Sequence, residues 1–456
     1  MLKKIKADNI NMTNGPLLPA IIRFYVPLVF SSLLQILYNA ADIIVIGKYS
    51  GKAPLAALGA TTNIIALIVN TFVGLAVGVN VAASKFIGAK KDKELYETVQ
   101  TSMFSSVVIG IVITIIGLFI SRPVLELMKT PADVIDLSDT YMKIFFMGSC
   151  GSMVYNFGAS ILRAAGDTKR PMYYLAFSGI INVILNVIFV KEFHMSVDGV
   201  AYATIISQYI SAVLVTISLA KTKNNYKFHI GKFMISWKRF MMIVKIGLPA
   251  GIQSALFSIS NIMIQSSINL LGSTVMAAST VSSNIENFVY VSMNAMSQTT
   301  ISFTSQNVGA EKYDRVWKTS RITLLLVTAI GAVLGLSACA FSEQLIHIYS
   351  KDTTILPFAK ERLFIVCVTY FTCGILDVLS SAVRGLGYSL APTAICILGI
   401  CGLRIVWVKT VFKNYRTLAS VMLSYPVSWI CSILVLTVVY LLIKKKINSK
   451  HKECIT

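Results

Sequence analysis

The chain has 456 residues, of which 55% are hydrophobic and only 13% charged, and its mean hydropathy is +0.72. This composition excludes an ordinary soluble globular protein, in which about 25% of the residues are charged. The formal net charge is +21, but the Lys and Arg residues gather in short segments between long apolar runs and in both tails. That distribution is typical of a helical membrane protein with many spans and argues against a nucleic-acid partner.

Twelve apolar segments are long enough to cross a bilayer as helices, which takes about 20 residues each. With the N-terminus placed in the cytoplasm, the cytoplasmic connections carry 18 Lys and Arg residues and the outer connections carry 8. This asymmetry predicts a multi-pass protein with both termini in the cytoplasm. The spans are predicted at residues 17–47, 54–84, 97–121, 135–162, 171–191, 199–220, 240–270, 274–307, 319–341, 357–383, 391–411 and 417–443.

The first span carries a carboxylate, Asp42, near its far end. A charged residue inside a membrane helix costs about 2.5–3.5 kcal/mol on insertion scales. Gln35, Tyr38 and Asn39 precede Asp42 by seven, four and three residues, so the four side chains share one helix face. Two interpretations stay open: a hydrogen bond that ties helices together, or a site for a cation or a proton.

The longest polar stretch is KTKNNYKFHIGKFMISWKR, residues 221–239, near the middle of the chain. We interpret it as a cytoplasmic linker between two lobes of six helices each, residues 1–230 and residues 231–456, the second ending in a basic tail. Its Phe, Met and Trp residues predict that part of the linker lies in the membrane interface as an amphipathic segment.

The two halves are repeats, which a single constant shift along the chain brings into register. The shift that carries Gly51 onto Gly272 also carries the connection RAAGDTKRP at 163–171 onto RGLGYSLAP at 384–392, so that Arg, Gly and Pro coincide. Because each half has an even number of spans, the repeats have the same orientation, as the parallel repeats of some transporters do. Two like lobes suit a protein that alternates between inward-open and outward-open states.

Only three acids lie well inside apolar spans: Asp42, Glu286 and Asp377. Intramembrane acids mark functional sites by default, which makes Glu286 and Asp377 candidates for a cation site in the second lobe. The structural alternatives are a helix-to-helix hydrogen bond for Glu286 and a pair with Arg384, two turns further on, for Asp377. Arg404 lies in the apolar run CILGICGLRIVWV and is a candidate partner for one of these acids.

Amide side chains are dense on the fifth, seventh and eighth spans. Asn182 and Asn186 are four residues apart on one face of the fifth span, where they can converge on Asp42. A carboxylate among amide oxygens and a Tyr hydroxyl can hold a proton or Na⁺. The alternative is interhelical hydrogen bonding, which contributes about 0.6 kcal/mol per bond in membranes. The candidate substrate-binding residues are Gln35, Gln253, Asn261, Gln265, Asn284, Phe288, Tyr290 and Asn294.

Nothing in the sequence indicates an enzyme or a nucleotide site. There is no GxxxxGK[ST] loop and no GxGxxG after a strand, so energy is expected from an ion gradient or a solute gradient. The four His residues lie at segment ends, and the eight Cys residues show no metal-ligand spacing. We interpret the Cys residues as small packing residues and expect no cofactor and no metal beyond a possible Na⁺ at Asp42.

These motifs, in this order, resemble the multidrug and toxic compound extrusion (MATE) transporters of bacteria over nearly the whole chain. The first span has the pattern P-x10-Y-N-x-x-D, from Pro27 to Asp42, followed by VIGKYSG. The connections GAKKDKE, GAEKYDR, RAAGDTKRP and RGLGYSLAP match as well, and so does the run NVILNVIFVKEFHMSVDGVAYATIISQ. The resemblance implies an all-helical membrane protein of two six-helix bundles in a V shape, located in the bacterial plasma membrane.

The resemblance also implies a function and a site. MATE transporters export organic, often cationic and amphipathic, compounds in exchange for H⁺ or Na⁺, and we expect this chain to act as a monomer. In bacterial members a first-lobe cation site uses residues matched here by Tyr38, Asp42, Asn182 and Thr204, while the second acid of that site is replaced by Asn186. Phe257 stands about where some members carry the Glu of a second-lobe sodium site.

Three other functions are weighed against export. A flippase for lipid-linked saccharides, from a related fold group, would have a strongly cationic central cleft and usually more than twelve spans. A membrane-embedded enzyme would need a constellation of His, Ser and Asp or a metal at one depth, and no His is placed for that. A channel would need a symmetric filter, which single acids in unlike lobes do not supply.

Overall fold

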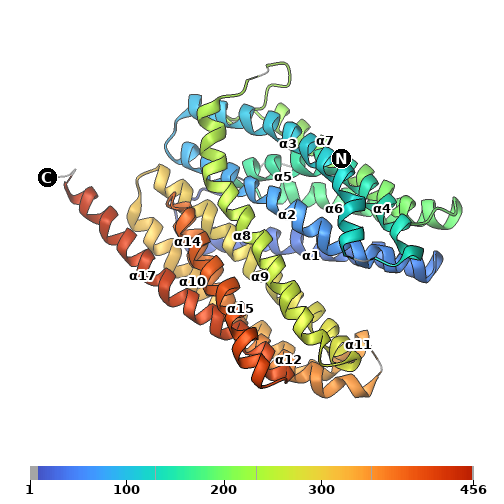
Figure 1. The fold of residues 1–456 in the computed structure, drawn as a ribbon. Coiled ribbons are helices and arrows are strands. Elements are labelled where there is room, and N and C mark those ends of the chain that lie inside the picture. The colour runs from blue at the N-terminus through green and yellow to red at the C-terminus, as the bar shows by residue number, and fades with distance from the viewer. Residues whose placement is uncertain (1–8, 129, 233, 351, 454–456) are drawn as a thin grey trace. The chain divides into compact units, whose positions relative to one another are not determined.

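The computed structural model describes residues 9–128, 130–232, 234–350 and 352–453, and in this part of the chain every regular element is helical (Figure 1). The predicted all-helical fold class is confirmed. Residues 1–8, which hold most of the basic N-terminal tail, and Cys454 lie outside the described residues. The other seven Cys residues are free thiols.

The chain divides into two compact units, Met1–Ser254 with Gly309–Glu311, and Ala255–Val308 with Lys312–Thr456. The division falls inside α8 (Trp237–Asn269), whereas the sequence analysis placed it at residues 230–231. The other helices of the first unit are α1 (Leu17–Tyr49), α2 (Lys52–Gly88), α3 (Asp92–Leu127), α4 (Ala132–Met147), α5 (Ser149–Ala164), α6 (Lys169–Val187), η2 (Ile188–Glu192) and α7 (Val197–Lys221). The second unit has α9 (Ser273–Gly309), α10 (Tyr313–Ala340), α11 (Ser342–Tyr349), η3 (Thr353–Ile355), α12 (Leu356–Val368), α13 (Tyr370–Gly385), α14 (Leu390–Cys396), η4 (Ile397–Gly402), α15 (Leu403–Trp407), η5 (Val408–Phe412), α16 (Leu418–Met422) and α17 (Ser424–Glu453).

Ten helical segments among the described residues are long and apolar enough to cross a membrane, and they coincide with ten of the twelve predicted spans. The remaining two spans correspond to α4 with α5 and to α9. α4 and α5 meet at Gly148 much as α12 and α13 meet at Thr369 inside a segment that qualifies, so the break is not the reason; α4 is made more polar by Asp133, Asp136, Asp139 and Lys143. α9 is 37 residues long, but Ser, Thr and Asn are frequent along it, which lowers its mean hydropathy.

The backbone carries the signature of the internal repeat. Gly51 and Gly272 both have positive φ (88° and 101°), as do Gly166 and Gly387 (88° and 95°). Lys90 and Glu311 adopt the same left-handed conformation at φ 53° and 57°, although their side chains make it uncommon. Each pair is related by the shift found in the sequence, so the two halves share their turns as well as their helices.

The helix breaks repeat at the same interval. α4 gives way to α5 at Gly148, and α12 gives way to α13 at Thr369, the position onto which the shift carries Gly148. A π-helical turn follows α6 as η2, and η5 occupies the corresponding place in the second unit. Such turns are rare and frequently occur at functional sites.

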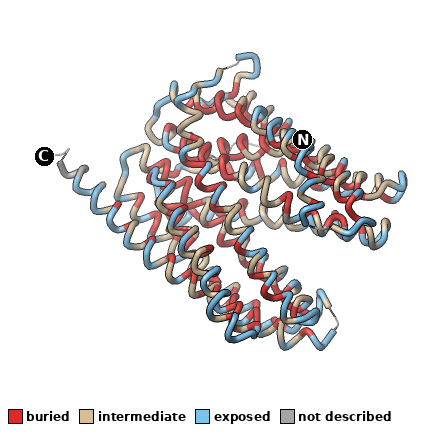
Figure 2. Tube along the Cα trace, in the orientation of Figure 1, coloured by how far each residue is buried: buried red, intermediate tan, exposed pale blue. Residues whose placement is uncertain are grey.

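Two apolar cores lie in the described part of the first unit, and buried residues occur along the length of its helices (Figure 2). One core joins α2, α3, α5 and α7 and includes Phe157 and Leu162, both with 1% or less of their surface exposed. The other joins α1, α2, α4 and α7 and includes Ile46, Met142 and Val200, each fully buried. The second core lies beside Asp42, so the packing that holds α1 in place also excludes water from the Asp42 side chain.

The linker docks on the first unit. Tyr226 and Phe228 are buried in the first core, and the phenolic oxygen of Tyr226 accepts a hydrogen bond of 3.2 Å from Arg170. Further along, Ile235 and Trp237 are exposed. The prediction that part of the linker lies in the membrane interface stays a prediction, and it applies to this exposed part alone.

Candidate functional site

Asp42 and Asn186 meet where α1 packs on α6. The Asp42 side chain is buried, with 9% of the residue exposed, and Asn186 is fully buried. The Asn186 amide nitrogen donates to Asp42 Oδ1 at 2.5 Å. Among the described residues no Lys, Arg or His lies within ion-pair distance of Asp42, so its charge is met by neutral dipoles alone.

The amides continue as a chain from this contact. Asn186 Nδ2 also donates to Asn182 Oδ1 at 3.3 Å, one helical turn earlier on α6. Asn182 Nδ2 in turn donates to the Thr204 hydroxyl on α7 at 3.5 Å, and Thr204 itself interacts with the Asp42 carboxylate. Tyr141, a buried residue of α4, interacts electrostatically with Asp42. Four helices therefore converge on one carboxylate.

One atom of this cluster has no partner in the part of the chain that the structure describes. It is Asn186 Oδ1, a buried carbonyl oxygen without a hydrogen bond. Leaving a buried acceptor unpaired costs about 1–3 kcal/mol. Because this oxygen and the Asp42 carboxylate belong to side chains in direct contact, the cluster has spare capacity for a proton or for a small cation that prefers oxygen ligands.

The other residues of the Asp42 face do not all join the cluster. The Tyr38 hydroxyl donates to the Leu175 carbonyl of α6 at 2.6 Å rather than to Asp42. Gln35 and Asn39 are exposed. A shared helix face thus brings these side chains to the same side of α1, but Tyr38 ties α1 to α6 at a separate point.

Glu286 on α9 forms a two-pronged ion pair with Arg362 on α12. Arg362 Nε and Nη2 donate to the two carboxylate oxygens at 2.8 and 2.9 Å, and Nη1 donates to the Ser279 hydroxyl. Glu286 and Arg362 are 6% and 5% exposed. The partner of Glu286 is therefore a basic residue, not a neighbouring amide as the structural alternative assumed, and the carboxylate is already neutralised.

Asp377 on α13 is partly buried and lies in electrostatic contact with Tyr290 and Arg384. The structure gives the Asp377 carboxylate no ion pair among the described residues. Tyr290 also interacts with Asn294, whose amide oxygen accepts from Gln298 at 3.4 Å. Two predicted substrate-binding residues, Tyr290 and Asn294, therefore lie in the same cluster as Asp377.

The remaining substrate-binding candidates fall into separate places. Asn284 and Phe288 are exposed on one face of α9, with 41% of Phe288 accessible. Gln253 is buried in α8. Gln265 donates a hydrogen bond to the side-chain oxygen of Asn269, one turn along the same helix. Asn261 accepts from Arg404. Arg404 forms no ion pair with Asp42, Glu286 or Asp377, so the interpretation of Arg404 as the partner of an intramembrane acid is wrong.

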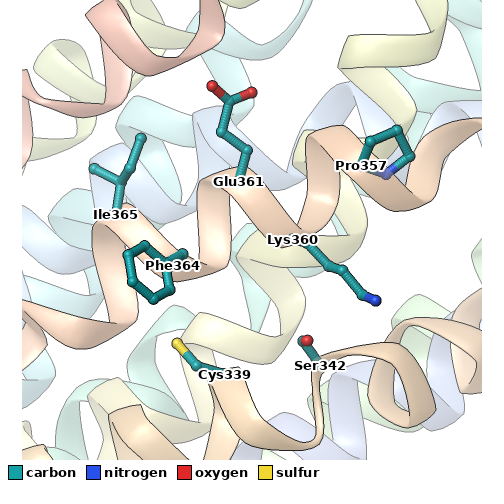
Figure 3. Close-up of a pocket in the computed structure, with 7 residues that line it drawn as sticks. All are labelled: Cys339, Ser342, Pro357, Lys360, Glu361, Phe364 and Ile365. Carbon is teal, nitrogen blue, oxygen red and sulfur yellow. The ribbon is translucent and has the colours of Figure 1, made fainter.

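A surface hollow of about 430 Å³ lies at one end of the second unit, between α10 and α12 (Figure 3). Phe364 and Cys339 face each other across it, while Glu361 points away from Cys339 and Ser342. Lys360, on its rim, is paired with Glu343 at 2.7 Å. None of the residues predicted to bind substrate or a cation lines this hollow, and it is open to solvent.

Two residues of these clusters were missed by the sequence analysis. Arg362 lies inside the predicted span 357–383, and the presence of opposite buried charges in one lobe was the available signal for its pair with Glu286. Tyr141 carried no such signal, because nothing in its spacing relates α4 to α1. Its position is informative only through the repeat, since the shift that relates the two halves carries Tyr141 onto Arg362.

Comparison with known proteins gives a consistent result. The profile of the family described as MatE matches residues 27–188 and 249–408 of this chain. The chain is similar to the probable multidrug resistance protein YoeA of Bacillus subtilis, with 28% identity over 432 residues, 93% of each chain. It is also similar to the probable multidrug resistance protein NorM of Thermotoga maritima, with 23% identity over 384 residues, 83% of this chain and 82% of that protein.

Solved structures show the same fold. A multidrug resistance MATE family transporter of the MOP superfamily in an outward-facing conformation matches with a TM-score of 0.90 and 21% identity, over 98% of this chain and 100% of that one. The Vibrio cholerae MATE transporter VcmN in its bent form matches with a TM-score of 0.86 and 21% identity, over 94% and 97% of the two chains. At this identity the likeness is evidence for the fold alone.

Proposed function

The chain belongs to the MatE family of membrane transporters, which are not enzymes, and on that premise we propose that it is a secondary active exporter of small organic compounds. Its relatives are described as multidrug resistance proteins, which supports amphipathic, often cationic, drugs as substrates. The driving force in this proposal is the exchange of substrate for H⁺ or Na⁺ at Asp42, and the protein works as a monomer.

The observation that carries the proposal is the pairing of an uncompensated carboxylate with an unpaired amide oxygen. Asp42 has no basic partner among the described residues, and Asn186 Oδ1 has no hydrogen bond. A proton on Asp42 would give the cluster a donor for that oxygen after a small rotation of the amide. Na⁺ would instead be bound by the carboxylate together with the amide oxygens of Asn182 and Asn186. Since the site holds one carboxylate, it balances one positive charge.

The proposed cycle follows from this exchange of charge. With Asp42 ionised, substrate binds from the cytoplasm at the exposed face of α9, where Phe288 offers an aromatic surface beside Asn284. Loading of Asp42 from the outside then favours the outward-open state that has released its substrate. A cation shifts this equilibrium only by the difference between its affinities for the two states.

Orientation belongs to the same proposal. The excess of Lys and Arg in alternate connections supports cytoplasmic termini and insertion in the bacterial plasma membrane. The loading site then opens to the outside at the end of α1 that carries Asp42. A reporter protein that is active only in the cytoplasm should be active when fused to the C-terminus, and a reporter that is active only outside the cytoplasm should be inactive there. The reverse pattern would overturn the assignment.

The test is export of a fluorescent organic cation from proteoliposomes, driven by an imposed pH gradient and, separately, by a Na⁺ gradient. Asp42→Asn should abolish gradient-driven export while the protein folds and reconstitutes normally. Asp139→Asn is the matched control, because this acid of α4 already has a basic partner, Lys143, at 2.7 Å. Full export by Asp42→Asn, or equal loss in both variants, would rule out Asp42 as the coupling site.

A further inference from the structure

Arg404 is a buried cation in the middle of the second unit that the export cycle does not use. It lies on α15, a single short helical turn between the π-helical turns η4 and η5, and only 3% of the residue is exposed. The segment that contains it, residues 390–412, is long and apolar enough to cross a membrane. A charged guanidinium inside a membrane segment costs free energy of insertion, and such a residue marks a functional site by default.

The contacts that Arg404 makes with described residues are with neutral groups. Its Nε donates to the Ser428 hydroxyl at 3.2 Å, and its Nη1 donates to Asn261 Oδ1 at 3.3 Å. The guanidinium carbon lies 4.0 Å from the centre of the Tyr425 ring, which satisfies the face of the cation but leaves its charge uncompensated.

No acid in the described part of the second unit neutralises Arg404. Glu286 is fully used by Arg362. Asp377 forms no ion pair with Arg404, and the groups with which Arg404 interacts electrostatically are Tyr425, Cys373, Cys401 and Tyr370. A buried pair is tolerated because the partners cancel each other, and a lone buried charge has no such compensation. Arg404 is therefore a buried positive charge without an acidic counter-ion among the described residues.

We propose that Arg404, Asn261, Ser428 and Tyr425 form a binding site for the carboxylate of an amphipathic substrate. The inference rests on the proposed export function and adds to it a recognition point for one chemical group of the substrate, the carboxylate. The planar guanidinium matches a carboxylate with two parallel hydrogen bonds, and the Tyr425 ring beneath it fixes that plane. Asn261 is exposed at the surface of the unit, so its amide is the group that the incoming carboxylate displaces from Nη1.

The chemistry favours a carboxylate over the phosphate of a lipid. A phosphate carries up to two charges at neutral pH and is usually held by more than one cation. Arg362, another buried basic residue of the same unit, also interacts with Tyr425, but it is bound to Glu286. A single positive charge with neutral donors around it fits a ligand of one negative charge.

The test compares two probes that differ at one group: a rhodamine with a free carboxylate and the methyl ester of the same dye. Binding is measured by equilibrium dialysis with the full-length protein in detergent, without any ion gradient, and empty micelles give the background. The wild type should bind the carboxylate dye more tightly than the ester. Arg404→Gln should weaken binding of the carboxylate dye about 10–100-fold, as expected for the loss of a charge-assisted bidentate contact, and should change ester binding less than about twofold.

Two further variants complete the design. Asn261→Ala should not weaken carboxylate binding and should tighten it slightly, because it removes the amide that the carboxylate must displace from Arg404 Nη1. Arg321→Gln, an exposed basic residue of α10, should leave both dyes unaffected. Because binding is measured without an ion gradient, carboxylate-dependent binding by a wild-type protein that fails to export would separate failure of the coupling mechanism from failure of this site. Equal weakening of the two dyes by Arg404→Gln, or no preference in the wild type, would overturn the proposal.

Discussion

The two units surround a buried carboxylate with different partners: neutral groups in the first unit and a basic residue in the second. In the first unit Asp42 contacts amides and hydroxyls, and one neighbouring oxygen is left without a partner. In the second unit Glu286 is held at both oxygens by Arg362. Both acids lie in long membrane helices and are almost fully buried. Their difference teaches that burial alone does not separate a candidate coupling acid from an acid held in an ion pair, and that the presence or absence of a fixed counter-charge has to be considered as well.

The repeat shows where the two environments diverge. Arg362 occupies the position of Tyr141 in the other half, while Asp42 corresponds to Met263 and Glu286 to Ile65. Each half thus brings one residue from the same helix position toward its own acid. A hydroxyl there leaves the acid without a counter-charge, as the proposed exchange of H⁺ or Na⁺ requires, whereas a guanidinium there holds the acid in an ion pair.

The largest effect is expected when the ion pair of Glu286 and Arg362 is broken. Glu286→Gln leaves Arg362 buried without its counter-ion, which should lower the stability of the folded protein by about 3–5 kcal/mol. Thermal unfolding in detergent measures this loss. The double variant Glu286→Gln with Arg362→Met should regain most of it, and Asp42→Asn should not destabilise at all. A stable Glu286→Gln variant would mean that the two carboxylates are equivalent.

The next largest effect is expected when Asn186, the hydrogen-bond partner of Asp42, is removed. Asn186→Ala removes the amide that donates to the carboxylate at 2.5 Å, and a hydrogen bond to a charged group contributes about 1.5–3 kcal/mol. The concentration of coupling ion that gives half-maximal export should change by about 10–100-fold. Ser31→Ala, which removes a hydroxyl bonded only to its own helix, serves as the control. An unchanged ion dependence in Asn186→Ala would remove this amide from the site.

A smaller effect concerns the frame that holds α1 against α6. A Cβ on Gly179 would lie 1.7 Å from Tyr38 Cζ, so Gly179→Ala must displace the ring that donates to Leu175. Overpacking of this kind typically costs about 1–3 kcal/mol, which thermal unfolding detects. Gly59→Ala on α2 is the matched control, because a Cβ there meets nothing within 4 Å. If both variants unfold at the wild-type temperature, Tyr38 does not fix the position of α1.

The smallest effect is expected at Thr204, which lies at the edge of the Asp42 cluster. Thr204→Val removes a hydroxyl that accepts from Asn182 at 3.5 Å, near the limit of a hydrogen bond, while keeping the shape of the side chain. A neutral hydrogen bond contributes about 0.5–1.5 kcal/mol, so the ion dependence of export should shift by about tenfold or less. A shift larger than that of Asn186→Ala would place Thr204, rather than Asn186, at the centre of the cluster.

Much of the fold was predictable because it depends on local patterns. Apolar length located the ten helical segments that are long and apolar enough to cross a membrane, and the predicted repeat that brings Gly51 onto Gly272 agrees with the positive φ of both residues. The contact between Asp42 and Asn186 was also within reach, since both are polar residues in apolar helices of one half.

The rest was not predictable, because it depends on which helices pack together. Tyr38 and Asp42 share a face of α1, yet their partners are Leu175 and Asn186, more than two turns apart on α6. Arg404 is bound by residues of α8 and α17, and no spacing within its own segment reveals them. The helix breaks at Gly148 and Thr369 likewise leave the apolar pattern uninterrupted.

The most direct measurement of the central claim is infrared difference spectroscopy of the reconstituted protein as the pH is lowered or Na⁺ is added. If Asp42 gains and loses the coupling ion, a carboxyl band should change with the ion and should disappear in Asp42→Asn. The same band should persist in the double variant Glu286→Gln with Arg362→Met, because that pair is permanently neutralised. A band that survives in Asp42→Asn, or is lost in the double variant, would contradict the assignment of the coupling site to the first unit.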